Sequence, residues 1–65
     1  MTVGTIKDLC KQEIDEIIYY DDKKNKEYDI LGKEGIKEFF EKHEKKLVYD
    51  CMYKPSDKKL YIHII

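Results

Sequence analysis

The residue types that could bind a metal ion are two histidines and two cysteines, His43, His63, Cys10 and Cys51. Zinc motifs place their ligands in close pairs along the chain. No two of these four residues stand close together in the sequence. We therefore expect no metal site and no other cofactor.

The other combinations that could carry chemistry are also incomplete. The adjacent carboxylates of Asp21 and Asp22 are followed by lysines, not by the further oxygen ligands that calcium requires. The glycines form neither a phosphate-binding loop nor a Gly-x-Ser-x-Gly elbow. His63 is expected to contact Asp50 across a hairpin, but a general base there would lack a nucleophile and an oxyanion site. We therefore expect a protein that is not an enzyme and that acts by binding.

The size of the chain sets its organisation and its stability. With 65 residues it is expected to form a single domain over residues 1–65. A domain of this size buries only about 60% of the surface that its unfolded chain exposes. With no signal-peptide pattern, the two cysteines are expected to be free thiols in a reducing cytoplasm. A disulfide is therefore not expected to compensate for the small buried surface. Association with another chain is the remaining way to gain stability.

The charge balance and the distribution of apolar residues exclude two classes of partner. Thirteen basic and 14 acidic residues are interleaved and leave a formal net charge of -1. A nucleic-acid-binding protein needs a basic face that displaces counterions from phosphates. No apolar run approaches the roughly 20 residues that span a bilayer. Nucleic acid and membrane are therefore not expected as partners.

Two helices are predicted. A hydroxyl at Thr5 before a carboxylate at Asp8 has the spacing of a capping box, which predicts a short helix over residues 5–12. A longer amphipathic helix should start near the glycines Gly32 and Gly35 and bury one apolar stripe, formed by Ile36, Phe39, Phe40, His43 and Leu47.

Four strands are predicted over residues 14–20, 27–31, 47–53 and 59–65, and they form two hairpins. With loops at 22–25 and 55–58, apolar residues face each other in both hairpins. The expected pairs are Tyr19 with Tyr28, Ile17 with Ile30, Tyr53 with Leu60, Cys51 with Ile62, and Tyr49 with Ile64. The predicted fold is α+β in the order αββαββ, a four-stranded, mainly antiparallel sheet of two hairpins with the long helix on one face.

The second face of this sheet would be unusually apolar for a surface that meets water. It would carry Ile14, Ile18, Tyr20, Val48, Met52, Tyr61 and Ile65. The N-terminal helix could cover part of it, or another chain could, and the sequence leaves both open. A homodimer is one candidate partner, and a host protein is another. The last strand could also offer an exposed edge for strand addition. The interface candidates are Ile18, Tyr20, Val48, Met52, Tyr61, His63 and Ile65.

The order of several segments resembles small uncharacterised proteins of phages and prophages in low-GC Gram-positive bacteria. The similar segments are Thr2-Val3 through Leu9, Asp15 to Asp22, Gly35-Ile36-Lys37-Glu38-Phe39-Phe40, and Lys59 to Ile64. Such proteins include inhibitors of host defence, such as anti-CRISPR proteins, which act stoichiometrically in the host cytoplasm. The resemblance implies a stoichiometric inhibitor that blocks the surface of a partner protein or sequesters a nucleotide signal, and it assigns no functional residue.

The sequence therefore favours a small non-enzymatic binding protein. The alternative is an oligomer that sequesters a nucleotide or another small molecule, because six tyrosines could stack on bases and a cleft between subunits could hold the ligand.

Overall fold

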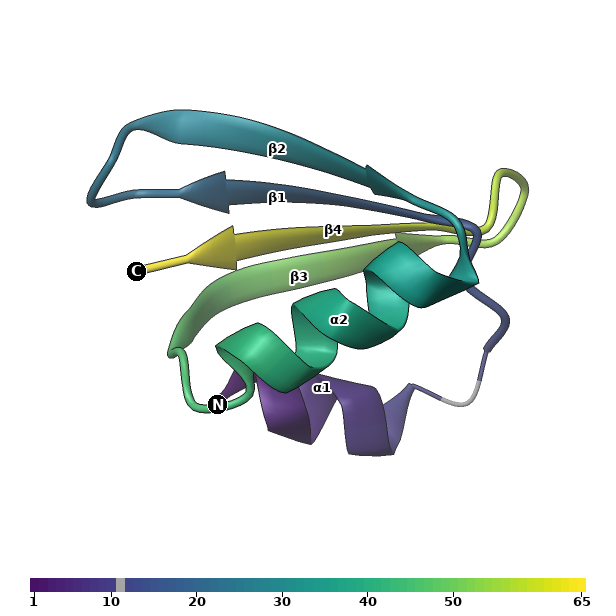
Figure 1. Ribbon diagram of the computed structural model, residues 1–65, viewed down its shortest axis with the longest axis horizontal. Coiled ribbons are helices and arrows are strands. Elements are labelled where there is room, and N and C mark those ends of the chain that lie inside the picture. The colour runs from purple at the N-terminus through teal and green to yellow at the C-terminus, as the bar shows by residue number, and fades with distance from the viewer. Residues whose placement is uncertain (11) are drawn as a thin grey trace.

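The computed structural model describes residues 1–10 and 12–65, and within them it contains two helices and four strands (Figure 1). The predicted α+β class and the element order αββαββ are confirmed. The elements along the chain are α1 (Val3–Leu9), β1 (Glu16–Asp21), β2 (Lys26–Leu31), α2 (Lys33–His43), β3 (Val48–Lys54) and β4 (Lys59–Ile64).

The four strands form one mixed sheet in the order β2-β1-β4-β3. Each hairpin is antiparallel, as predicted, but the hairpins join through a parallel pair, β1 with β4. The first and the last strand therefore lie in the centre. The expectation that the terminal strand forms an exposed edge is wrong, because β4 has a neighbour on both sides. The edges are β2 and β3.

The register of both hairpins follows the prediction over most of their length. In the first, Tyr19 pairs with Tyr28 and Ile17 with Ile30. In the second, Tyr53 pairs with Leu60 and Cys51 with Ile62. Four-residue turns at 22–25 and 55–58 join the strands. Since a shift of one residue would turn every side chain to the other face, these turns and the apolar alternation together fix the register.

A bulge at the start of β3 overturns the prediction for Val48 and Tyr49. The register shifts between Val48 and Asp50, so Val48 and not Tyr49 pairs with Ile64. A bulge adds one residue to a strand and thereby changes which side chains face the core. Val48, predicted on the second face, is 7% exposed in the core, whereas Tyr49 is 69% exposed.

Helix α1 begins earlier than predicted. Its N-cap is Thr2, whose side chain accepts a hydrogen bond from the backbone N–H of Thr5. Two further N–H groups, of Val3 and Gly4, donate to the carbonyls of Lys46 and Glu44 just after α2. The helix ends at Leu9 and not at residue 12, and the predicted helical position 11 lies outside the described residues.

Helix α2 buries the predicted aromatic stripe but ends sooner. Its buried side chains are Ile36, Phe39 and Phe40. The helix starts after Gly32, whose φ of 85° lies in the left-handed region that glycine adopts without strain. It ends at His43, so Leu47 does not extend the stripe and is 57% exposed instead.

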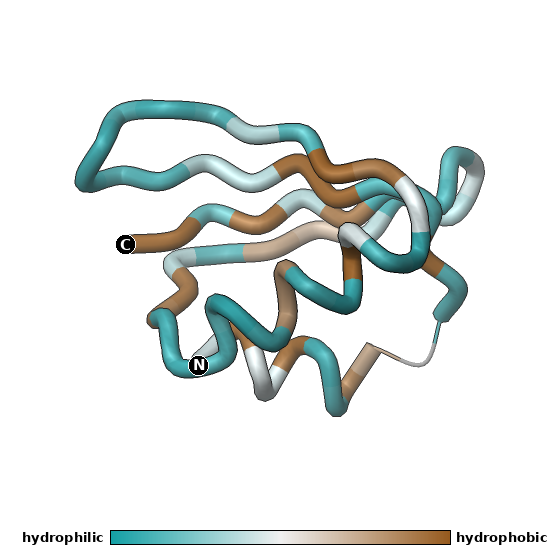
Figure 2. The backbone as a smooth tube through the Cα atoms, in the orientation of Figure 1, coloured by the Kyte–Doolittle hydropathy of each residue, from teal (hydrophilic) through white to brown (hydrophobic). Residues whose placement is uncertain are grey.

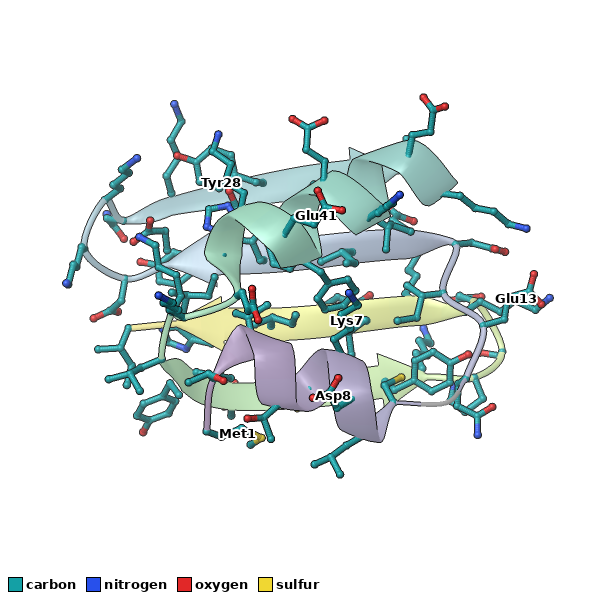
Figure 3. The ribbon with its side chains drawn as sticks, turned by 60° about the horizontal axis from the view of Figure 1, so that its bottom comes forward. Met1, Lys7, Asp8, Glu13, Tyr28 and Glu41 are labelled. Atoms are coloured by element: carbon teal, nitrogen blue, oxygen red, sulfur yellow. The ribbon has the colours of Figure 1, made fainter. Side chains whose placement is uncertain are left out.

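Both helices lie on the same side of the sheet (Figure 1). Figure 3 shows this side, with α2 over β1 and β2 and α1 over β4 and β3. Val3 and Ile6 of α1 belong to the same core cluster as the aromatic residues of α2, and Ile14, predicted on the second face, also packs against this cluster. The option that the N-terminal helix covers the second face is therefore wrong.

The hydropathy of the chain agrees with this layering. Apolar residues follow the strands beneath the helices, and the turn between β1 and β2 is hydrophilic (Figure 2). Among the described residues, no helix combines the length and the apolar composition that crossing a bilayer requires.

Candidate functional site

The side of the sheet opposite the helices, here called the open face, carries one side chain from every second position of each strand. Its middle row crosses the sheet from Asp29 through Ile18 and Tyr61 to Met52. The next row, toward the turn between β1 and β2, is formed by Glu27, Tyr20, His63 and Asp50. The centre of the open face is therefore apolar and aromatic, and its flanks are charged.

His63 is the centre of an aromatic cluster on the open face. Its ring lies 5.0 Å from the ring of Tyr20 in an edge-on arrangement and 5.1 Å from the ring of Tyr49. Its Nε2 lies 3.3 Å from a carboxylate oxygen of Asp22. The hydroxyl of Tyr20 donates a hydrogen bond to the side chain of Asn25. The cluster thus links β1, β4, the bulge and the first turn.

One end of the open face is acidic. Glu27 and Asp50 lie on it, Asp22 adjoins His63, and Asp29 lies next to it at the β2 edge of the middle row. At the other end Lys59 and Glu16 are 3.4 Å apart, and the charge of this carboxylate raises the pKa of Lys59. The remaining strand lysine at that end, Lys54, pairs with Asp57 at 3.2 Å. The described ion pairs thus involve both strand lysines at one end, whereas at the other end the described pair is that of Asp22 with His63.

Most of the predicted interface residues lie together on the open face. Ile18, Tyr20, Tyr61 and His63 are partly exposed and Met52 is 59% exposed. They line an open hollow of about 390 Å³ together with Glu27 and Asp50. Ile65 follows β4 and borders a separate hollow with Asp22, Tyr49 and His63. Val48 does not belong to this surface, because the bulge turns it into the core.

Sequence reasoning missed two members of the cluster. Tyr49 was expected beneath the helices, and Asp50 rather than Asp22 was expected to contact His63. Asp50 does lie opposite His63 in the register, but the contact of the imidazole is with Asp22. Only the bulge and the parallel pairing of β1 with β4 bring these side chains together, and neither leaves a pattern in the local sequence.

The side chains around His63 show what the open face presents. The described contacts of His63 are to Asp22, Tyr20 and Tyr49, and none supplies a serine or cysteine nucleophile. Over residues 1–10 and 12–65, no group of three or more His, Cys, Asp or Glu side chains is arranged to hold a metal ion. What the open face offers is aromatic and aliphatic area with a carboxylate rim.

The remaining histidine and the cysteines lie on the helix side. His43 packs against the rings of Tyr19 and Phe39, and burial lowers its pKa, as do the charges of Lys46 and Lys42. Cys10 and Cys51 are free thiols that line one apolar cavity of about 200 Å³ near the β3 edge.

Comparison with known proteins gave no matching family model, no significantly similar curated protein and no significantly similar solved structure.

Proposed function

We propose that this chain is a small non-enzymatic binding protein that holds another protein on its open face. The observation that carries the proposal is a sheet face with Ile18, Tyr61 and Met52 at its centre, while both helices lie on the other side. Contiguous apolar surface of this kind is typical of contact sites. Tyrosine and methionine are also common in such contacts, because one is rigid and amphipathic and the other adapts its shape.

The rim of the open face defines the chemistry of the partner. Glu27, Asp29 and Asp50 border the apolar centre, so the partner should present an apolar patch flanked by lysine or arginine side chains. Binding of this kind is stoichiometric. It suits an inhibitor that covers a surface of a host protein, which is the role implied by the resemblance to small phage proteins.

A nucleotide-sequestering oligomer is the second candidate, because the rings of Tyr20, His63 and Tyr49 lie close together and could stack on a base. The carboxylates of Glu27 and Asp50 line the same hollow and would repel phosphate. The charge around the cluster therefore supports protein binding over nucleotide binding.

The experiment compares the wild type with Tyr61→Asp on the open face and Thr5→Asp on α1. Each variant adds one negative charge, but Thr5 is exposed on the helix side. A partner retained by the tagged wild type from cells that express the protein is purified, and its affinity for all three proteins is measured by calorimetry. We expect Thr5→Asp to bind like the wild type and Tyr61→Asp to bind about thirtyfold more weakly, the loss typical of a central contact residue.

Circular dichroism shows whether each variant is folded, and Met52→Asp, at a more exposed position, replaces Tyr61→Asp if the latter unfolds. Equal affinity of the folded variants and the wild type would contradict the proposal. A nucleotide found by native mass spectrometry on the purified protein, with no protein partner, would favour the second candidate.

A further inference from the structure

The edge strand β3 has a free segment that begins after its bulge. The inner side of β3 pairs with β4 along its length. On its outer side, the start of the chain takes the first positions, since Thr2 bridges to Leu47 and the carbonyl of Met1 accepts a hydrogen bond from the N–H of Val48. In the described part of the chain, no strand pairs with the outer side of residues 50–54. These five residues form an edge that another strand could extend.

Exposed apolar side chains gather around this edge. Of the large hydrophobic residues that the structure exposes, all but Leu31 lie on β3 or on segments next to it. Tyr49 and Met52 belong to β3, and Leu47 precedes it. The N–H of Val48 donates a hydrogen bond to the carbonyl of Met1, and the N–H of Ile65 donates one to the carbonyl of Leu47. Leu9 lines the cavity that contains Cys51 and Tyr53. Met1 is seen beside β3 in Figure 3.

We propose that two copies of this chain associate by antiparallel pairing of β3 with β3, centred on Met52, so that their sheets become one eight-stranded sheet. In this register Asp50 of each copy lies opposite Lys54 of the other, and Cys51 lies opposite Tyr53. Directly opposed residues on one face of an antiparallel pair interact through their side chains. The two-fold arrangement therefore forms two opposite-charge pairs and opposes apolar residues at the other positions.

The ion pair that Lys54 makes within its own chain does not prevent it from pairing with Asp50 of a second copy. Lys54 pairs with Asp57 three residues away, and both side chains are about half exposed. Such surface pairs contribute little to stability, so Lys54 is free to turn to Asp50 of a second copy. The pairing also ends before it reaches the N-terminus of the first copy. Pro55 of the second copy would lie opposite Tyr49, and the next residue, Val48, already donates a hydrogen bond to Met1.

The other edge, β2, lacks this self-complementarity. Pairing β2 with itself about Tyr28 places Glu27 of one copy opposite Asp29 of the other, and pairing about Asp29 places that carboxylate opposite itself. Like charges directly opposed destabilise a strand pair. Charged residues on an edge strand are a common protection against association. Both of these β2 registers oppose like charges, whereas the β3 register about Met52 opposes unlike charges.

The contact is small. Five residues at about 3.4 Å each give a pairing of about 17 Å, which belongs with the smallest specific interfaces. The dimer should therefore be reversible and depend on protein concentration. It pairs the backbone of β3, so it does not require the proposed protein partner, although the side chains of Asp50 and Met52 also belong to the open face.

The test exchanges the charges at Asp50 and Lys54, both exposed, in the full chain. In Asp50→Lys alone, both cross-copy pairs become lysine with lysine, and in Lys54→Asp alone both become carboxylate with carboxylate. Mixing the two variants restores both opposite-charge pairs in a heterodimer. Sedimentation equilibrium from micromolar to millimolar protein measures the association of the wild type, of each variant and of the mixture.

We expect the wild type and the mixture to dimerise, and each variant alone to dimerise at least about tenfold more weakly. The double variant Asp50→Lys/Lys54→Asp should associate like the wild type. A wild type that stays monomeric at millimolar concentration, or variants that associate equally well alone and mixed, would overturn the proposal.

The variant Tyr61→Asp separates this proposal from the proposed function. If it loses the partner but keeps the dimer, the two surfaces are distinct. If it loses the dimer as well, the open face and not the β3 edge joins the two copies, and the edge proposal is overturned.

Discussion

The neighbours Ile17 and Ile18 on β1 offer a sharp comparison of the two faces of the sheet. Ile17 is fully buried beneath the helices and pairs with Ile30 and Leu60, whereas Ile18 lies on the open face beside Asp29 and Tyr61. Replacing each by valine removes the same methylene from the same strand. Backbone propensity is unchanged, since both residues are β-branched. The difference between the two variants therefore measures burial alone.

The expected cost of Ile17→Val is about 1 kcal/mol, because burial of a methylene is worth about 0.8 kcal/mol and the small cavity adds to it. At about 0.05–0.15 kcal/mol per residue, the 65-residue chain has a total stability of only about 3–10 kcal/mol. The melting temperature should consequently fall by about 4–8 °C. Ile18→Val should cost less than about 0.5 kcal/mol, as is usual at a surface position.

Urea unfolding followed by far-UV circular dichroism and by tyrosine fluorescence measures both values, since the chain has six tyrosines and no tryptophan. Micromolar protein keeps association small. A cost of Ile18→Val equal to that of Ile17→Val would refute the reasoning, because it would mean that the open face is covered in the isolated chain.

Three further predictions concern local features. Gly32→Ala should cost about 1–2 kcal/mol in urea unfolding, because alanine is strained at a φ of 85°; an unchanged midpoint would contradict it. Gly4→Ala should destabilise the contact between α1 and the segment after α2 and lower the melting temperature, since an added Cβ would lie 3.1 Å from the backbone oxygen of Glu44; a melting temperature equal to the wild type would show that the helix shifts freely. Burial lowers the pKa of His43 in the folded chain below the ordinary histidine value of about 6.5. The unfolded chain therefore binds more protons than the folded chain just below that pH. The free energy of unfolding should consequently fall as the pH drops from about 7.5 to 5.5. His43→Leu should lose less over that range, and equal losses in the two proteins would argue against this cause.

The hairpins and the long helix could be predicted because their determinants are close in the sequence. The turn at 22–25 and the alternation of Ile17, Tyr19, Tyr28 and Ile30 set one register, and Phe39 and Phe40 marked the buried face of α2. A cap was also expected near the start of α1. The hydroxyl that forms it belongs to Thr2, three residues before the predicted capping residue Thr5, and Thr2 also bridges to Leu47.

The parts that could not be predicted depend on contacts between distant segments. Nothing near β1 or β4 in the sequence indicates that they pair in parallel, yet this pairing brings His63 beside Tyr20 and puts β3 at the edge. The bulge exchanges the expected places of Val48 and Tyr49. It directly follows Leu47, which bridges to Thr2 and accepts a hydrogen bond from the N–H of Ile65, and both of these partners are distant in the sequence.

Local patterns in the chain were enough to locate the strands and helices approximately and to indicate more apolar side chains than one helix can cover. The position of the surplus follows from the packing of both helices on one side of the sheet. The physical reason is the range of the interactions: turn geometry and side-chain alternation act between neighbours, whereas the order of strands and the placement of α1 are set by burial shared among Val3, Ile6, Phe40 and the central strands.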